Sequence, residues 1–385
     1  MKVLHIGKYS PPFFGGIENF MMDLGQACDA QNVKSAAIVH HHQAGQKFDK
    51  RDIDGMTVYR VPCYGQLMFA PVSPAFGFYL NKVIDEFKPD ILHFHMPNTS
   101  AFFALFSAKA RALKWVVHWH SDVLGDDSPW FLRAFYPFYR PLESWVLKRA
   151  KKVIATSAPY LQSSMALKKI TNKCQVIELG IKPRKGPAAQ ARLRHEDQPL
   201  QLLVVGRLTY YKGHRFLIDA LLLLKRQGLT KIKLNIVGGG ELYEQLQQQV
   251  EQLGLSSQVL LHGKVSFDAL QSQFEQAHCV CLASIERTEA FGVVLMEAAS
   301  FAVPAIVTNV PGSGMSWAVQ HGQTGLVVNR SDAQALANGI EDLYRNPQQL
   351  FDYAQAAHQR FLQHFQIEAV ASTTIELYRS VSEQS

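Results

Sequence analysis

The sequence is poor in cysteine, and its five cysteines are scattered, odd in number and without CxxC spacing. That pattern argues against a disulfide framework and against a cysteine zinc site, and it fits a reducing compartment. No apolar run approaches the ~18 residues that cross a bilayer. The N-terminal segment has no small-residue cleavage site of the kind that ends a signal peptide. We therefore predict a cytoplasmic protein that does not span a membrane.

The usual nucleotide-binding glycine motifs are also missing. The turn KYSPPFFGGIENF, which holds Gly15 and Gly16, is neither GxGxxG nor GxxxxGK[ST]. The run Gly238–Gly240 starts like GxGxxG, but Tyr243 stands where the third glycine should be. The dinucleotide and P-loop interpretations therefore fail for the first turn, and the dehydrogenase interpretation of the second is weak. Either turn can still bring backbone N–H groups to an anionic ligand at a helix N-terminus, or be an ordinary tight turn.

Basic residues are concentrated in the first half of the chain. Residues 1–185 hold 24 Lys and Arg against 14 Asp and Glu, a balance of +10, whereas 186–385 hold 15 against 18, a balance of −3. The basic half indicates an anionic partner, such as a lipid surface, a phosphorylated acceptor or nucleic acid. Its charges are dispersed and no RNA- or DNA-binding motif occurs, so we predict no nucleic-acid partner.

Short apolar, β-branched runs alternate with amphipathic helical patterns, which is typical of parallel sheets built from βαβ units. The predicted strands are 3–6, 36–40, 58–60, 91–94, 115–118, 153–155, 201–205, 233–237, 259–262, 280–283, 305–308 and 325–328. A chain of 385 residues exceeds one ordinary core. The predicted fold class is α/β, with two Rossmann-like doubly wound domains facing each other across a cleft.

The domain boundaries follow from the polar, aperiodic segment Lys182–Pro199, which we predict to be the linker. The first domain is placed at residues 1–185 and the second at 186–365. A C-terminal helix over about 366–385 is expected to pack back on the first domain.

A basic pair follows the strand 201–205. Ligands of such sheets bind outside the carboxyl ends of the strands, and Arg207 and Lys212 lie in the loop there. A guanidinium and an ammonium can neutralise a diphosphate without a metal. Taken alone, such a pair more often belongs to a solvated loop.

The segment SIERTEAFGVVLMEAAS, residues 284–300, carries Glu289 and Glu297 in an otherwise apolar stretch. A helix over 291–299 is predicted, with Glu289 just before its N-terminus and Glu297 about two turns inside. Glu289 could serve only to complement the helix dipole. Burying Glu297 unpaired is costly. Eight residues apart, the two carboxylates can reach two points along one extended ligand.

Histidines end two predicted strands of the first domain, namely His93, His95, His118 and His120. His120 is expected to point into the cleft and to hydrogen-bond or position a polar ligand. The strand direction is expected to put neighbouring histidines on opposite faces, so no metal site is predicted.

One carboxylate pair, Asp52 and Asp54, has the DxD spacing of metal-dependent nucleotide-sugar enzymes. Gly55 and a strand-like MTVYR follow it, and this order favours a solvated hairpin turn over a metal site.

Seven stretches occur in one order along nearly the whole chain: PPFFGGIENF, HFHMPN, the loop after His120, GRLTYYKG, VGGGE, EAFGVVLMEA and GQTGLVV. In that order they resemble the retaining glycosyltransferases of family 4, which have two Rossmann-like domains (the GT-B fold). HWHSD, EAFG and PGSGMSWAVQHGQTGL are most similar to bacterial mannosyl- and related transferases of cell-surface polysaccharide assembly.

The resemblance implies a role for each matching residue. Glu289 would contact the donor sugar, Glu297 the ribose, Arg207 and Lys212 the diphosphate, and His120 the surroundings of the sugar 6-hydroxyl and the acceptor. The implied catalytic residues are His120, Glu289, Arg207 and Lys212, and the implied donor-binding residues are Gly16, Arg207, Lys212, Gly239, Phe291, Gly292, Val293 and Glu297.

The implied reaction moves a hexose, with a mannose-type sugar favoured, from a nucleotide sugar to a hydroxyl of a lipid-linked or glycan acceptor, with retention. The first domain would bind the acceptor and the second the donor. No cofactor and no metal are implied, and catalysis would rest on electrostatics and positioning. A nucleotide-sugar epimerase of the same architecture is the alternative.

The segment Pro129–Lys152 mixes aromatic residues with Arg and Lys. Such a segment suits the inner face of the cytoplasmic membrane, with anionic lipid as a partner. A helix whose aromatic residues pack into its own domain predicts the same composition.

Overall fold

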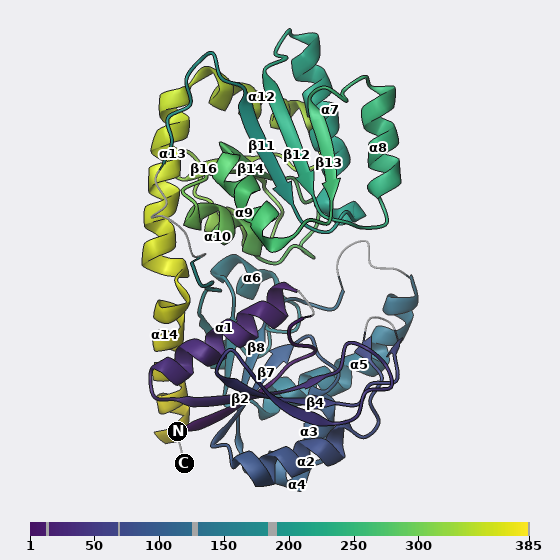
Figure 1. Ribbon diagram of the computed structural model, residues 1–385. Helices are drawn as coiled ribbons and strands as arrows, with labels where there is room; N and C mark the ends of the chain where they lie inside the picture. Colours follow the sequence, from purple (N-terminus) through teal and green to yellow (C-terminus); the bar gives the residue numbers. More distant parts are fainter. Residues whose placement is uncertain (13–14, 68–69, 125–129, 184–190, 384–385) are drawn as a thin grey trace. The chain divides into compact units, whose positions relative to one another are not determined.

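The structure is a computed structural model that describes residues 1–12, 15–67, 70–124, 130–183 and 191–383. The chain divides into two units, Met1–Lys182 with Phe365–Ser385, and Pro183–His364. The sequence places these boundaries after residues 185 and 365. Each unit is an α/β sheet with helices on both faces, as predicted (Figure 1). Residues 184–190 of the predicted linker and Pro129 of the aromatic segment lie outside the described residues.

The first unit has an eight-stranded sheet in the order β10-β9-β8-β7-β1-β2-β4-β3. All neighbours in it pair in parallel except β3 and β4. Its strands are β1 (Lys2–Ile6), β2 (Lys34–His40), β3 (Asp49–Ile53), β4 (Met56–Val61), β7 (Ile91–Met96), β8 (Lys114–Trp119), β9 (Lys152–Ala155) and β10 (Cys174–Val176), with β5 (Gln66–Leu67) and β6 (Ala70–Pro71) forming a separate small hairpin.

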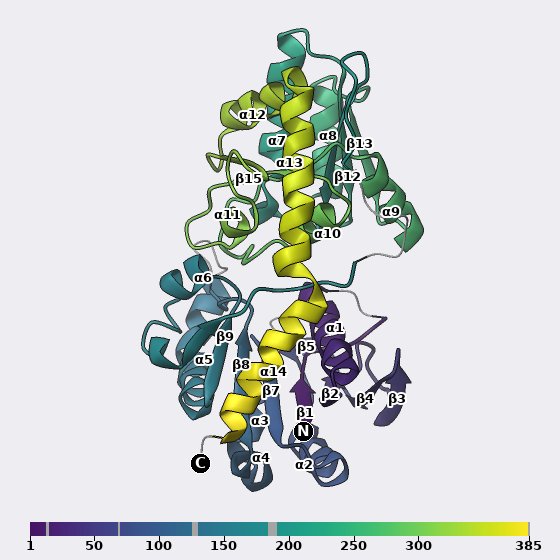
Figure 2. The same ribbon diagram turned by 90° about the vertical axis from the view of Figure 1, so that its left-hand side faces the viewer.

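Helices cover this sheet on both faces. They are α1 (Gly16–Ala30), α2 (Phe76–Phe87), α3 (Ala101–Phe106), α4 (Ala108–Ala112), α5 (Trp130–Arg149), α6 (Ala158–Ser163) and α14 (Ile367–Glu383), with a 3-10 turn, η1, at Thr171–Lys173. The C-terminal helix α14 lies beside α1 on one face (Figure 2), while α2, α3, α4 and α5 pack together on the other. Strands β7 and β8 are buried along nearly their whole length, as central parallel strands are when both faces are covered.

The segment with the DxD spacing, Asp52 to Asp54, lies at a hairpin turn, as predicted. Strands β3 and β4 pair with Ile53 opposite Met56. The two residues between them, Asp54 and Gly55, have φ of 50° and 86°, which is the conformation of a two-residue hairpin loop. The Gly55 N–H donates to Asp52 Oδ1 at 2.8 Å. Asp52 therefore stabilises the turn.

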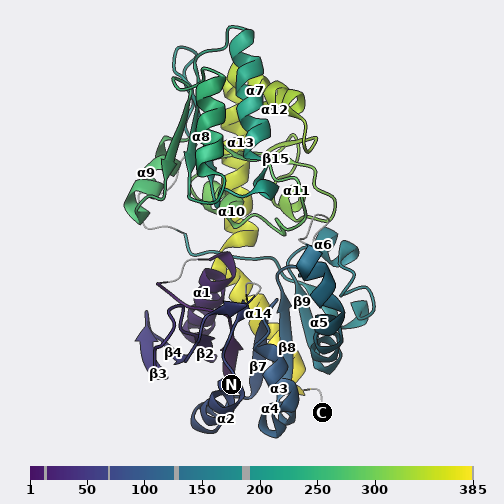
Figure 3. The same cartoon turned by 90° about the vertical axis from the view of Figure 1, so that its right-hand side faces the viewer.

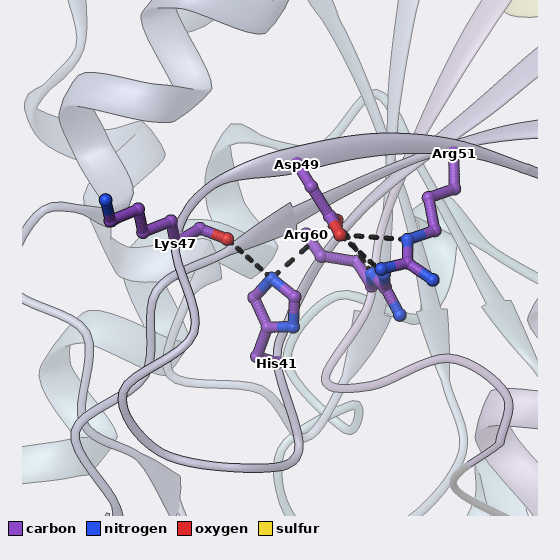
Figure 4. Close-up of polar contacts among 5 residues, drawn as sticks. All are labelled: His41, Lys47, Asp49, Arg51 and Arg60. Atoms are coloured by element: carbon purple, nitrogen blue, oxygen red, sulfur yellow. Dashed lines mark hydrogen bonds and ion pairs between the residues drawn. The ribbon is translucent and has the colours of Figure 1, made fainter.

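Charged groups fasten the edge strand β3 to its neighbour β4 (Figure 4). The Arg60 guanidinium donates to both carboxylate oxygens of Asp49, at 2.8 and 2.6 Å, and Arg51 Nε donates at 2.9 Å. The bond from Arg60 is the largest of several effects that lower the pKa of Asp49. These groups are satisfied within the hairpin, so they serve the fold.

The second unit has a six-stranded parallel sheet in the order β13-β12-β11-β14-β15-β16. Its strands are β11 (Leu200–Val205), β12 (Ile232–Val237), β13 (Val259–Gly263), β14 (Cys279–Leu282), β15 (Ala305–Thr308) and β16 (Gly325–Val328). Its helices are α7 (His214–Arg226), α8 (Tyr243–Gln252), α9 (Phe267–Gln276), α10 (Val293–Ser300), α11 (Met315–Ala318), α12 (Ala333–Arg345) and α13 (Pro347–Arg360), with short turns η2 (Tyr210–Lys212) and η3 (Phe361–Phe365, the latter of π type).

Helix α7 packs against α8 and α12 on one face of this sheet, and α10 packs against α11 and α13 on the other (Figure 3). The core between the sheet and α7 is aliphatic, with Leu202, Leu221 and Ile236 fully buried or nearly so. Among the described residues of both units, no helix is long and apolar enough to cross a membrane.

Candidate functional site

The sheet order of the second unit marks one place for a ligand. Strand β11 lies between β12 and β14, and its helix connection leads to β12 while that of β14 leads to β15 on the other side. Connections that leave in opposite directions open a crevice at the carboxyl ends of the two strands. The loop after β11 holds Arg207 and Lys212, and the loop after β14 holds Glu289.

Lys212 and Glu289 meet across this crevice. The Lys212 ammonium donates directly to Glu289 Oε2, and the two side chains are only 11% and 12% exposed. Ser284 Oγ donates to the same carboxylate oxygen at 3.4 Å. Burial alone would lower the pKa of Lys212, but the attraction of Glu289 and Tyr211 outweighs it and the pKa is raised. The second unit therefore holds a charged ammonium, paired with a carboxylate, at the crevice.

A glycine makes this meeting possible. Gly213 caps α7 with a left-handed φ of 67°, and a Cβ there would collide with the carbonyl oxygen of Ala283. The turn η2 therefore approaches the end of β14 closely, and the Ile285 N–H donates to the Tyr211 carbonyl at 2.8 Å. A larger residue after Lys212 would push the ammonium away from Glu289.

The helix after Glu289 begins later than predicted. Gly292, with φ of 83°, is the N-cap, and α10 runs from Val293 to Ser300. Glu297 is its fifth residue and lies about one turn inside the helix, so the prediction of two turns is wrong. A left-handed glycine beside buried Phe291 delays the helix start. Glu297 is half-buried.

Arg207 lies apart from this ion pair. Its side chain is 68% exposed, and Nη2 is 3.7 Å from Glu241 Oε2. An exposed pair of this kind contributes ~0–1 kcal/mol, so the guanidinium can leave it at little cost. The loop after β12 is bonded to the same loop, because the Leu208 N–H donates to the Gly239 carbonyl at 3.1 Å. The structure thus brings Arg207 and Gly239 into neighbouring loops.

Glu286 is a buried carboxylate that the sequence reasoning missed. It is 3% exposed, and the Tyr210 hydroxyl donates to its Oε2 at 2.8 Å. This bond ties the loop after β14 to η2 beside Lys212. The signal was present, because Glu286 is a third carboxylate in SIERTEAFGVVLMEAAS.

In the first unit the strand whose neighbours are reached by connections in opposite directions, the switch point of the sheet, is β1, between β2 and β7. Gly16 is exposed and begins α1, a helix of 15 residues whose N-cap, Gly15, offers no side chain. The carboxylate of Glu18 folds back to the space beside Gly15. Burial is the main cause of the raised pKa of Glu18. An anion at Gly16 would therefore meet a carboxylate that must move or be protonated.

The strand-end histidines lie on one face of the sheet, so the prediction of opposite faces is wrong. Side chains alternate with a period of two, and residues two apart, such as His93 and His95, share a face. The register sets His93 beside His5 and His95 beside His118. His5, which the sequence reasoning missed, joins the group from β1. All five imidazoles, with His120 after β8, are buried.

Their contacts are hydrogen bonds and ring stacking. His95 Nδ1 lies 3.0 Å from His120 Nε2, and His5 Nδ1 lies 3.1 Å from His95 Nε2. The rings of His118 and His120 stack with centroids 4.3 Å apart and planes 3° from parallel. Burial lowers the pKa of His120 to about 3. His120 is 4% exposed, so the contact with a ligand predicted for it stays a prediction.

Ring nitrogens in two triads, His5, His93, His95 and His95, His118, His120, lie within 4.8 Å of one another. That spacing alone suits a metal ion. The lone pair of an imidazole nitrogen lies in the ring plane, however, and parallel stacked rings cannot direct their lone pairs at one point. The stacked arrangement of His118 and His120 therefore disfavours a shared ion.

Two doubly wound α/β units, with charged side chains at the switch point of the second, define a protein of the GT-B glycosyltransferase fold. Residues 187–360 match the family described as "Glycosyl transferases group 1", and residues 15–180 match the "Glycosyl transferase 4-like domain". The chain belongs to the group 1 glycosyltransferases.

Individual relatives agree with this assignment. The chain is 30% identical to the D-rhamnosyltransferase WbpZ of Pseudomonas aeruginosa over 95% of this chain and 92% of that protein. It is 28% identical to the O-antigen chain mannosyltransferase C of Escherichia coli over 100% and 99% of the two chains. The sucrose-phosphate synthase structure from Thermosynechococcus elongatus aligns over 100% of both chains with a TM-score of 0.78 at 20% identity, which shows the shared fold.

Proposed function

We propose that this glycosyltransferase moves a manno-configured hexose from a nucleotide sugar to a hydroxyl of a lipid-linked or glycan acceptor in cell-surface polysaccharide synthesis. The observation that carries the proposal is the buried Lys212–Glu289 pair at the switch point of the second unit. A charged ammonium there suits a diphosphate leaving group. Beside it, a carboxylate suits the hydroxyls of the sugar.

The donor roles that we propose are those that the family resemblance implies. Lys212 binds the diphosphate and Arg207, which is exposed and loosely paired, swings to join it. Glu289 then exchanges its ammonium partner for hydroxyls of the sugar, and Glu297 binds the ribose. The remaining donor contacts come from the backbone at Gly16, Gly239, Phe291, Gly292 and Val293.

The proposed reaction proceeds with retention at the anomeric carbon. The negative charge that develops on the departing diphosphate is stabilised by Lys212 and Arg207, whose charges are in place before the bond breaks. Neither a cofactor nor a metal ion is part of the proposal. His120 is a candidate for positioning sugar or acceptor.

The type of sugar is supported by the named relatives. One is called a mannosyltransferase and the other a D-rhamnosyltransferase, and D-rhamnose is the 6-deoxy form of D-mannose. The two sugars share their ring configuration. GDP-mannose is therefore the first donor to test, with UDP-glucose as the comparison.

The proposed site of membrane contact is the outer face of α5. Aromatic side chains on it are strongly exposed, with Trp130 at 81% and Phe138 at 76%, and Arg140 and Lys148 are exposed among them. The opposite side of the helix is buried through Val146 and Leu147. One helix thus packs into its own unit and also presents an aromatic, basic face of the kind that binds an anionic lipid surface.

Sedimentation with phosphatidylglycerol vesicles tests this contact. The double variant Trp130→Ser with Phe138→Ser should lose binding, and the matched control Phe267→Ser, which removes an exposed phenylalanine from α9 in the second unit, should keep it. Equal binding to neutral and anionic vesicles would contradict the proposal.

The donor proposal is tested by thermal shift with a panel of nucleotide sugars, followed by transfer assays on lipid-linked acceptors with the best binder. Lys212→Ala should abolish the shift that the donor produces. If the chain instead epimerises the nucleotide sugar without an acceptor, the transferase proposal fails and the alternative enzyme class is correct.

A further inference from the structure

The five imidazoles form a column, defined here as His5, His93, His95, His118 and His120, that lies across β1, β7 and β8. On one side Phe20 of α1 covers its rings edge-on, with centroids 4.9 Å from His118 and 5.5 Å from His120. On another side the Tyr378 hydroxyl of α14 is hydrogen-bonded to His93 Nδ1. Both helices belong to the first unit. The column is therefore part of the core of that unit.

The column is a buried, uncharged environment. Its members are at most 4% exposed. A proton added to any one of them would place a charge among neutral rings that lie about 5 Å away, and no carboxylate of the described residues is bonded to it. Burial accordingly lowers the pKa of every member. Each imidazole is neutral at pH 7 and carries one proton on one of its two nitrogens.

The members of the column differ in their hydrogen bonds. His5, His95 and His120 form a chain in which the central ring, His95, uses both nitrogens. His118 stacks on His120 yet, within the described residues, neither of its nitrogens has a hydrogen-bond partner. His93 bonds outward to Tyr378.

The chain links the tautomers of its members. If the proton of His95 is on Nδ1, it is donated to His120 Nε2, so His120 must carry its own proton on Nδ1. His95 Nε2 then accepts, and His5 must donate from Nδ1. If the proton of His95 is on Nε2, the same logic puts the protons of His5 and His120 on Nε2. Any mixed arrangement would face two N–H groups or two lone pairs within 3.1 Å.

We propose that His95 is a positioning residue that fixes both the ring orientation and the tautomer of His120, through a chain in which His5, His95 and His120 share one tautomer. The outermost nitrogen of this chain, His120 Nδ1, is then a donor in one state and an acceptor in the other. The hydrogen-bonding role of His120 toward a hydroxyl is thus coupled to His5 on β1, two strands away from β8. The catalytic consequence rests on the proposed function, whereas the shared tautomer does not.

Nitrogen NMR of the protein labelled with 15N-histidine at pH 7 tests the chain without substrate. Ring nitrogens are assigned with single His→Phe variants, and long-range proton–nitrogen correlations show which nitrogen carries the proton. The expected result is three neutral rings, all protonated on Nδ1 or all on Nε2. A charged ring or two different tautomers among the three would overturn the proposal.

Two variants separate positioning from packing. His95→Phe keeps a stacked ring and removes both bonds of the chain, so His120 should show averaged signals from two tautomers. His118→Phe removes a stacked ring that makes no hydrogen bond to any described residue, so the His120 signals should keep their single tautomer. If His95→Phe does not fold, His5→Phe, which cuts the far bond alone, should still alter the signals of His95. Unchanged His95 signals there would refute the chain.

If the transferase proposal holds, His95→Phe should lower kcat by about tenfold or more with KM for the donor unchanged, since misplaced catalytic groups cost rate rather than binding. His118→Phe should leave kcat as in the wild type. Titration with Zn²⁺ completes the test. Tight one-to-one binding that shifts the signals of the chain would show a metal site and overturn the proposal.

Discussion

Acid should unfold the first unit before the second, because of its buried histidines. In the unfolded chain a histidine has a pKa of about 6.5, whereas burial lowers the pKa of His5, His40 and His120 to about 3. Below pH 6.5 the unfolded state therefore binds protons that the folded state does not. Stability must fall as the pH drops from 6.5 towards 3, and no such loss occurs above 6.5.

The size of the loss follows from the pKa difference. At pH 5 each such histidine favours the unfolded state by ~2 kcal/mol, because one pH unit corresponds to about 1.36 kcal/mol. Three of them cost ~6 kcal/mol, and burial also lowers the pKa values of His93, His95 and His118 well below 6.5, which adds to the loss. Domains are stable by about 5–15 kcal/mol, so the first unit should unfold near pH 5.

The second unit has fewer such groups. Burial is the main cause that lowers the pKa of His214 and His278 to about 4, so its loss at pH 5 is ~4 kcal/mol. Urea unfolding at pH 7.5, 6 and 5, followed by tryptophan fluorescence, measures the difference, because four of the five tryptophans belong to the first unit. His118→Phe should reduce by one the number of protons that the first unit takes up on unfolding in acid, and so lower the pH dependence of its free energy of unfolding. A first unit equally stable at pH 7.5 and 5 would refute the reasoning.

Three further predictions concern single side chains. Glu297→Ala should mainly raise KM for the donor and Glu289→Ala should mainly lower kcat, as steady-state kinetics will show; equal effects of both variants on both constants would contradict the proposed roles. Glu289→Gln should tighten nucleoside diphosphate binding in calorimetry about tenfold, ~1.4 kcal/mol, because the carboxylate at Lys212 repels a phosphate; weaker binding would count against a diphosphate at Lys212. His118→Phe should raise the free energy of unfolding at pH 7.5 by ~1–2 kcal/mol, because it removes two buried nitrogens that have no partner among the residues that the structure describes; a loss of stability would indicate a partner for that ring.

Much of the fold could be predicted from apolar periodicity. All twelve predicted strands occur in the structure, because nearly all of them are buried runs that pair in parallel with a neighbour. The strands that were missed are short or exposed. Strand β3 is an exposed or half-buried edge strand with the sequence DKRDI, and β10 has three residues, none buried. Such strands carry no apolar alternation, and only pairing with a neighbour defines them.

The site could be predicted in part. The order of strands along the chain predicts the loops after β11 and β14, and these loops put Lys212 and Glu289 at the carboxyl edge of the second sheet. Their direct contact depends on the left-handed Gly213, and no pattern in the sequence shows how closely two loops approach. The histidine column was misjudged because the period of two was not applied to His93 and His95. Strand register, which brings His5 beside His93, is not visible in the sequence.

The central claim is glycosyl transfer with retention, and the most direct measurement is proton NMR of a reaction with GDP-mannose and a lipid-linked acceptor. The anomeric signal shows the configuration of the new bond, and the signals of the donor show its fate. We predict release of GDP only when acceptor is present, a product with the anomeric configuration of the donor, and no turnover by Lys212→Ala. Inversion at the anomeric carbon, or conversion of the donor to an epimer without acceptor, would contradict the account.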